Sequence, residues 1–164
     1  MKNYLRRFGL GLLILSCVAG CASLPPPSAP LEYADDLVAA GKLSASRQTP
    51  IMLVFTHPDC PYCVTAKKEH IEQLHVSRNY GSKVIVREVE AENTKLALRD
   101  FDGKATTHAE LARRYNIKSV PTVIVVDARG KPLGDPIIGI VTPDFYNLYL
   151  EQAIDAGRLQ LRRK

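Results

Sequence analysis

The pattern of apolar and polar positions predicts alternating helices and strands from about residue 31 onward. Residues 31–41 carry apolar side chains at helical spacing, and Gly41 is expected to end this helix. Residues 51–55 form a continuous apolar run, which is typical of a strand buried on both faces of its sheet. Residues 61–76 are predicted to be helical, because Pro61 suits a first helical turn and apolar side chains then recur on one face.

The second half of the chain continues this alternation. The predicted elements are strand 84–89, polar loop 91–107, helix 107–115, strand 122–126, a turn at 127–130, strand 136–141 and helix 142–156. Thr107 can cap its helix, since Glu110 follows three residues later at the spacing of a capping box. Gly157 is expected to end the last helix.

The order of these elements predicts the α/β fold class. A β-α-β unit followed by a β-β-α unit gives one mixed sheet of about four strands, with helices on both faces. Neither an internal repeat nor a linker divides residues 31–164. We therefore expect a single domain over residues 31–164.

Residues 1–20 have the pattern of an export signal. Basic residues precede an apolar run, and this run is shorter than the roughly 20 residues needed to cross a bilayer. Val18-Ala19-Gly20-Cys21 then resembles the bacterial lipobox, which implies cleavage before Cys21 and lipid attachment to it. The alternative is an ordinary signal peptide that is cut near Ala22 or Ser23.

Residues 21–30 are rich in proline, which favours an extended, polyproline-type chain. We expect them to tether the domain to the periplasmic face of a bacterial membrane. An ordinary disordered N-terminus predicts the same conformation. The residue after the lipidated position is Ala22 and not Asp. By resemblance to Gram-negative sorting rules, this favours the outer membrane.

The composition is that of an ordinary globular protein. Apolar residues make up 46% of the 164 residues and charged residues 24%, so the chain can bury a core without disulfide staples. The formal net charge is +5, and Lys2, Arg6 and Arg7 supply part of it from the leader, where no acid occurs. Because no basic patch with interleaved aromatic residues is present, we do not expect nucleic-acid binding.

Four cysteines are distributed unevenly along the chain. Cys17 and Cys21 lie in the leader region, whereas Cys60 and Cys63 form a C-x-x-C motif. Such a motif can be a redox dithiol, part of a zinc site or a structural disulfide. Its position at a predicted helix start favours the redox dithiol, because unpaired backbone N–H groups and the helix dipole stabilise a thiolate there.

This position assigns different roles to the two cysteines. A helix N-terminus can lower the pKa of a cysteine thiol from about 8.5 to about 3.5–7.5. Cys60 is therefore predicted to be the nucleophile. Cys63 lies one turn further into the helix, where it is more buried, and is predicted to resolve the mixed disulfide and release the partner.

The chain resembles the thioredoxin superfamily over about residues 45–156. The resemblance depends on the apolar strand 51–55, on Cys60-Pro61-Tyr62-Cys63, on Val120-Pro121-Thr122 before a later strand, and on two glycines, Gly130 and Gly139. It is strongest toward bacterial periplasmic thioredoxin-like thiol reductases with an extra loop before the third helix. It implies a thiol–disulfide oxidoreductase that acts as a monomer without a cofactor. Its expected partners are exported proteins with disulfides and a membrane electron donor.

The resemblance also implies roles for individual residues. Pro61 and Tyr62 would set the shape and redox poise of the loop. Pro121 would be a cis-proline that packs against the dithiol, and the backbone of Val120 would pair with the substrate chain. The alternative for Pro121 is an ordinary trans-proline at a strand start.

One position departs from the superfamily pattern. Many thioredoxins have a buried Asp six residues before the first cysteine, where this chain has Val54. Candidates for the missing proton relay are Glu88, Glu90 and His57. Each of them is also explained as a solvated surface residue.

The C-x-x-C motif also occurs in zinc sites, in structural disulfides and in c-type haem attachment. Possible zinc ligands are His57, Cys60, Cys63 and His70. A second C-x-x-C is missing, and Pro61 and Tyr62 match a redox loop better, so we predict no metal. A purely structural disulfide over so short a loop gains little chain entropy. Val64 excludes c-type haem attachment. The direction of electron flow stays open, with an oxidase or isomerase as the alternatives.

Overall fold

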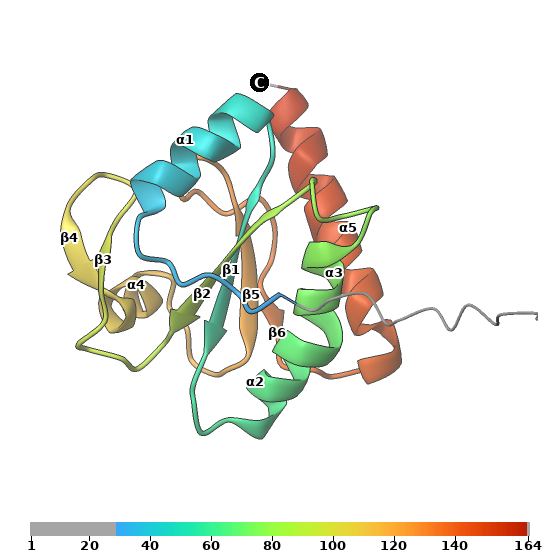
Figure 1. Cartoon of the computed structure of the whole chain (residues 1–164), viewed down its shortest axis with the longest axis horizontal. Helices are drawn as coiled ribbons and strands as arrows, with labels where there is room; N and C mark the ends of the chain where they lie inside the picture. Colours follow the sequence, from blue (N-terminus) through green and yellow to red (C-terminus); the bar gives the residue numbers. More distant parts are fainter. Residues whose placement is uncertain (1–28, 164) are drawn as a thin grey trace, which may run out of the picture.

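Four strands form a mixed central sheet in the order β2-β1-β5-β6 (Figure 1). β1 (Ile51–Thr56) pairs parallel with β2 (Ile85–Glu90) and antiparallel with β5 (Thr122–Val126). β6 (Ile137–Ile138) pairs antiparallel with β5 at the edge and is shorter than the predicted strand 136–141. The predicted α/β class and the mixed sheet of about four strands are confirmed.

The structure is a computed structural model, and it describes residues 29–163. The predicted signal peptide, the lipidation of Cys21 and most of the tether lie outside these residues. Within residues 29–163, no helix is both long and apolar enough to cross a membrane.

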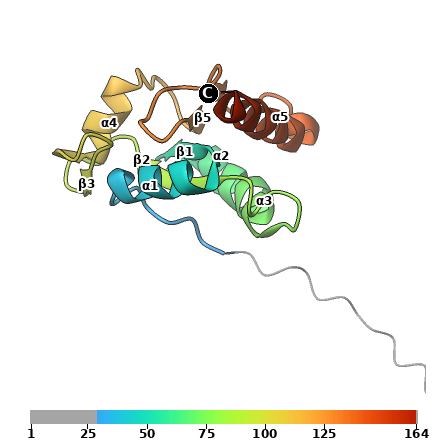
Figure 2. The same ribbon diagram turned by 90° about the horizontal axis from the view of Figure 1, so that it is seen from above.

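Helices cover both faces of the sheet, as Figures 1 and 2 show. α1 (Leu37–Arg47) and α4 (His108–Arg114) pack on one face. α5 (Pro143–Arg162) packs on the other face beside helix 61–76. Helix 61–76 consists of three consecutive parts: α2 (Pro61–Thr65), the π-helical stretch η1 (Ala66–Ile71) and α3 (Glu72–Val76).

β1 is buried along its whole length and separates two apolar clusters. Ile51, Leu53 and Phe55 enter the cluster formed with α1 and α4, whereas Met52 and Val54 enter the cluster formed with helix 61–76 and α5. Full burial of one such side chain stabilises the fold by about 1.5–3 kcal/mol. β1 is thus firmly anchored, and it fixes the loop that follows it and carries the C-x-x-C motif.

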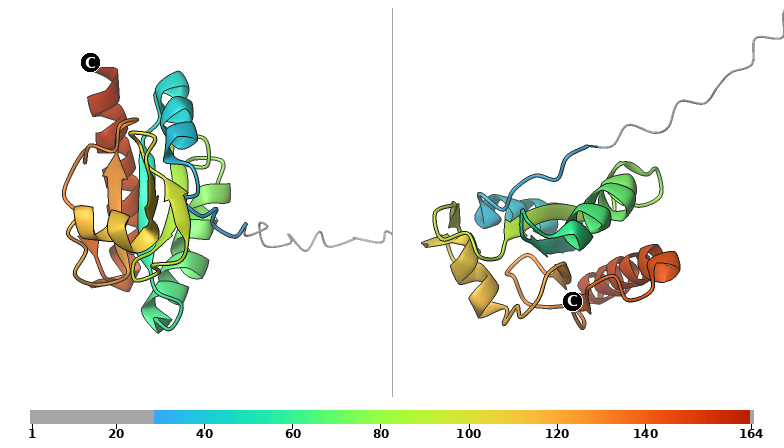
Figure 3. Two further views of the ribbon diagram at one scale, coloured as in Figure 1. Left: turned by 90° about the vertical axis from the view of Figure 1, so that its left-hand side faces the viewer. Right: turned by 90° about the horizontal axis from the view of Figure 1, so that it is seen from below.

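The prediction of a helix over 31–41 was wrong in its position. Asp36 caps α1, since its side chain accepts the N–H of Ala39, and the segment before Asp36 is extended. That segment lies beside β2 (Figure 3). A parallel β-bridge joins Tyr33 to Glu88 there. Gly41 lies inside α1 and does not end it. A side chain there would collide with the backbone carbonyl of Ala128.

The prediction of a structureless loop over 91–107 was also wrong in part. β3 (Ala97–Arg99) and β4 (Ala105–Thr107) form a separate antiparallel hairpin. Leu98 is its one buried apolar side chain, so the hairpin has almost no hydrophobic pattern. Thr107 caps α4 as predicted, because its hydroxyl accepts the N–H of Glu110.

The last helix continues past Gly157 to Arg162, so the predicted end at Gly157 was wrong. Gly157 is buried against the sheet. A Cβ at this position would lie 3.1 Å from Val125 Cγ1 and 3.3 Å from Leu133 Cδ1. Glycine therefore serves close helix–sheet packing here, and the helix tolerates its intrinsic cost of about 1 kcal/mol.

Candidate active site

Cys60 and Cys63 form a disulfide at the N-terminus of α2, with their Cα atoms 5.2 Å apart. Cys60 is the N-cap residue, and its Sγ accepts the backbone N–H of Cys63 at 3.1 Å. Cys63 is 1% exposed, whereas Cys60 is half-buried between the exposed Pro61 and Asp59. The accessible sulfur is therefore the one that the helix N-terminus supports.

The local sequence explains this geometry. Pro61 occupies the first helical position, where its fixed φ suits the helix and its missing N–H costs nothing. Cys60 itself is extended, with φ −100° and ψ 106°. Its N–H donates to the carbonyl of His57 at 3.2 Å, and its carbonyl accepts the N–H of Val64 at 3.2 Å. The loop after β1 thus turns directly into the helix and presents Cys60 at the turn.

The Val120–Pro121 segment meets the disulfide from the other side. The peptide bond between these residues is cis, and the carbonyl oxygen of Val120 lies 3.8 Å from Cys60 Sγ. Pro121 is buried, and its carbonyl accepts the N–H of Gly139 at 2.8 Å. The Val120–Pro121 segment, which is distant in sequence, therefore lies beside Cys60 and is itself held by Gly139.

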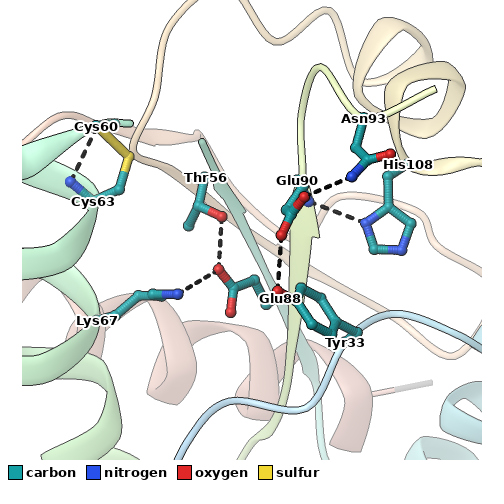
Figure 4. Close-up of polar contacts among 9 residues, drawn as sticks. All are labelled: Tyr33, Thr56, Cys60, Cys63, Lys67, Glu88, Glu90, Asn93 and His108. Atoms are coloured by element: carbon teal, nitrogen blue, oxygen red, sulfur yellow. Dashed lines mark hydrogen bonds and ion pairs between the residues drawn. A yellow bond between two sulfur atoms is a disulfide. The ribbon is translucent and has the colours of Figure 1, made fainter. Parts of the chain in front are cut away.

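Glu88 lies on the same face of the sheet as Val54. Parallel pairing places Glu88 directly beside Val54, so both side chains point toward helix 61–76. Glu88 is 4% exposed. Its Oε1 accepts the hydroxyl of Thr56 and the ammonium of Lys67, both at 2.7 Å (Figure 4). Lys67 was not predicted, although its spacing of four residues from Cys63 was a usable signal.

Comparison with known proteins identifies the family. The sequence matches a family described as a thioredoxin-like domain over residues 38–154. The chain belongs to this family. The resemblance to the thioredoxin superfamily is thereby confirmed, while the signal peptide and the lipid anchor stay predictions. No curated protein matches the chain.

Solved structures of thioredoxin-fold proteins share the fold of this thioredoxin-like domain. Oxidised mitochondrial thioredoxin 3 from Saccharomyces cerevisiae is 16% identical, with a TM-score of 0.51 over 76% of this chain and 93% of that protein. A thioredoxin-fold protein from Helicobacter pylori is 23% identical, with a TM-score of 0.51 over 68% and 73%. Thioredoxin from Trypanosoma brucei brucei is 20% identical, with a TM-score of 0.50 over 78% and 93%. At these identities the likeness shows the fold alone.

Glu90, the second candidate relay, is held by neutral donors at the edge of the thioredoxin-like sheet. Its carboxylate accepts the hydroxyl of Tyr33 at 2.8 Å and the amide of Asn93 at 2.7 Å. The Asn93 hydrogen bond is the main cause that lowers the pKa of Glu90 below its usual value. The hydrogen bond between Tyr33 and Glu90 raises the pKa of Tyr33 to about 12. The hydrogen bonds from Tyr33 and Asn93 therefore stabilise the ionised form of Glu90.

His57, the third candidate, is tied to the loop before Cys60. Its Nδ1 accepts the backbone N–H of Asp59 at 3.1 Å, and its Nε2 lies 3.7 Å from Glu92 Oε2. The hydrogen bond to Asp59 fixes the residues immediately before Cys60, so His57 helps to shape this loop.

His108, the first residue of α4, is a buried histidine beside β2. It is 0% exposed, and its Nδ1 accepts the N–H of Glu90 at 3.0 Å. Burial lowers the pKa of His108, although the nearby carboxylates of Asp35, Glu90 and Glu88 partly oppose this. Its Nε2 is buried without a hydrogen-bond partner.

The four possible zinc ligands do not converge. Cys60 and Cys63 bond to each other, His57 faces Glu92, and His70 Nδ1 lies 2.9 Å from Asn147 Oδ1. Among residues 29–163, no group of three or more His, Cys, Asp or Glu side chains has an arrangement that would hold a metal ion. The site is an adjacent cysteine pair in a thioredoxin-like domain, with Cys60 partly exposed. This arrangement supports thiol–disulfide oxidoreductase chemistry.

Proposed function

We propose that the protein reduces disulfides of exported proteins through the Cys60–Cys63 dithiol. The observation that carries this proposal is the placement of Cys60. Its sulfur caps the helix by accepting the N–H of Cys63, and it lies next to the Val120 carbonyl before a cis-proline. The capping contact favours a thiolate at Cys60, and the second contact puts the backbone of Val120 beside it.

The reaction proceeds by two exchanges. The Cys60 thiolate attacks one sulfur of the substrate disulfide, so a Cys60–substrate bond forms and the substrate releases its other sulfur as a thiolate. Cys63 then loses its proton and attacks Cys60 Sγ, which releases the second substrate thiolate and forms the Cys60–Cys63 disulfide. Two electrons pass to the substrate, and the released thiolates take up protons.

The surroundings of Cys60 suit an extended polypeptide substrate. The backbone of Val120 would pair with the substrate chain next to Pro121. Tyr62 is 70% exposed and Ile138 is 55% exposed, so apolar surface is available for its side chains. Pro61 and Tyr62 would set the redox poise of the loop between the cysteines.

Localisation and partners complete the proposal. Val18-Ala19-Gly20-Cys21 supports a lipid anchor at Cys21, with the domain on the periplasmic face of a membrane and the outer membrane favoured. Because exported compartments are oxidising, a reductase there needs a membrane electron donor. Changing Cys21 to Ser should move the protein from the membrane fraction to the soluble fraction after cell fractionation. Unchanged membrane association would contradict the anchor at Cys21.

Insulin reduction tests the catalytic proposal. With the pre-reduced full chain, Cys60→Ser should slow reduction by at least about a hundredfold, because it removes the nucleophile. Cys63→Ser should instead accumulate a mixed disulfide between Cys60 and insulin, visible on a non-reducing gel. Insulin reduction that survives Cys60→Ser would falsify the proposal.

The redox potential of the Cys60–Cys63 couple tests the direction of electron flow. A reductase is expected near about −270 mV, the value for thioredoxin, whereas an oxidase is expected near about −120 mV. Equilibration of the full chain with glutathione or dithiothreitol buffers gives this potential. A value near the oxidase end would overturn the reductase assignment and leave the thiol–disulfide exchange itself intact.

A further inference from the structure

A partly buried ion pair links the helix of the C-x-x-C motif to the sheet. Lys67 Nζ lies 2.7 Å from Glu88 Oε1, and the side chains are 26% and 6% exposed. Thr56, the last residue of β1, donates its hydroxyl to the same carboxylate oxygen at 2.7 Å. Figure 4 shows the side chains of Lys67 and Glu88 pointing toward one another. Both charges are therefore held in fixed places.

The pair also has a fixed relation to the cysteines. Lys67 follows Cys63 by four residues in one continuous helical segment, so the two side chains leave neighbouring positions of the same helix face. Thr56 precedes Cys60 by four residues at the end of β1. Glu88 lies beside Val54 on the sheet face that helix 61–76 covers. Because Glu88 is buried and Lys67 is partly buried, solvent and salt screen their electrostatic interactions less than those of exposed charges.

We propose that Lys67 and Glu88 are positioning residues that set the redox potential of the Cys60–Cys63 couple with opposite signs. This inference rests on the proposed function of the dithiol. The disulfide carries no charge. Its reduction adds two electrons and, when one sulfur stays ionised, one proton, so the dithiol carries a thiolate. The Lys67 ammonium favours that thiolate, and the Glu88 carboxylate disfavours it.

The opposite signs give a sharp test with the full chain. Glu88→Gln leaves the Lys67 cation without its anion, so the couple should become more oxidising. Lys67→Met leaves the Glu88 carboxylate, so the couple should become more reducing. Each variant should change the equilibrium constant with dithiothreitol or glutathione by about tenfold, which is about 30 mV for a two-electron couple. Two shifts of the same sign, or no shift, would overturn the inference.

An ion pair with a purely structural role predicts different redox potentials. Two further variants distinguish this role from potential tuning, even if Lys67→Met or Glu88→Gln fails to fold. The exchange Lys67→Glu with Glu88→Lys retains an ion pair but reverses its direction. A structural role predicts the wild-type potential, whereas our inference predicts a shift of at least about threefold in the equilibrium constant. Lys67→Arg with Glu88 unchanged keeps both charges and should keep the wild-type potential. A tenfold shift in that variant would also contradict the inference.

Matched controls come from an exposed pair elsewhere in the domain. Lys104 Nζ lies 2.9 Å from Asp102 Oδ2, and these side chains are 83% and 48% exposed. Lys104→Met and Asp102→Asn should leave the potential of the couple unchanged. If the Lys67 and Glu88 variants keep the wild-type potential while Cys60→Ser still abolishes insulin reduction, this inference fails and the proposed function stands.

Discussion

Glu88 and Glu90 lie two positions apart on β2, yet their carboxylates bind partners from two different regions of the molecule. The Glu88 carboxylate accepts a hydrogen bond from the Lys67 ammonium on helix 61–76. The Glu90 carboxylate accepts hydrogen bonds from the neutral donors Tyr33 and Asn93 at the sheet edge. Both carboxylates lie within the same six-residue strand. The difference indicates that the partner of a buried carboxylate, more than its place in the sequence, decides what it can do.

The same comparison separates electrostatic function from local architecture. The Glu88 carboxylate faces the Lys67 ammonium on the helix that carries Cys63, so either charge can act on the dithiol. Around Glu90 the backbone N–H is bound by His108, and the carboxylate joins the segment before α1 to the loop after β2. We therefore expect changes near Glu88 to alter redox properties and changes near Glu90 to alter stability alone.

The largest expected effect on stability comes from Lys67→Met. This change leaves the Glu88 carboxylate buried without its cation, and breaking a buried pair in this way costs about 3 kcal/mol. Urea unfolding at neutral pH measures the loss through a lower transition midpoint with an unchanged slope. A loss below about 1 kcal/mol would mean that Lys67 and Glu88 are effectively solvated, which would remove the contrast with Glu90.

A smaller effect is expected from pH at His108. Burial lowers the pKa of this histidine in the folded chain, so the unfolded chain binds the proton more readily. The stability due to neutral His108 is complete above the unfolded pKa of about 6.5 and is lost as the pH falls from there to the lower folded pKa. The slope is at most about 1.4 kcal/mol per pH unit.

His108→Gln is the matched variant for this titration. Its side-chain oxygen can accept the N–H of Glu90, and it does not ionise. The difference in unfolding free energy between wild type and His108→Gln should therefore shrink or change sign as the pH falls below about 6.5. The redox potential at a fixed pH should not change. A difference that is constant with pH would show that His108 is protonated equally in both states.

The sequence predicted those features that depend on local chemistry. The buried strand β1, the proline at the helix start and the capping of α4 each follow from residues close together in the chain. The C-x-x-C motif identified Cys60 and Cys63, whose disulfide the structure contains. These features need no knowledge of the tertiary fold.

The remaining features depend on contacts between distant segments. The spacing from Cys63 places Lys67 near the motif, but a lysine on a helix usually faces water. Its pairing with Glu88 follows from the parallel register that puts Glu88 beside Val54. Gly41 and Gly157 are residues that often end helices, but here Gly41 permits close approach to the backbone of Ala128 and Gly157 permits close packing against the sheet. Register and packing of this kind cannot be inferred from one sequence.

The smallest expected effect, Tyr33→Phe, examines the Glu90 side of the comparison. This change removes the hydroxyl that donates to Glu90 Oε1 at 2.8 Å and keeps the ring, which packs edge-on against His108. Because Asn93 still binds the carboxylate, we expect a loss of about 1 kcal/mol in unfolding free energy. The redox potential should stay at the wild-type value, in contrast to Glu88→Gln. A potential shift comparable with that of Glu88→Gln would show that the two carboxylates act on the dithiol together, and the division of β2 into two regions would then be incorrect.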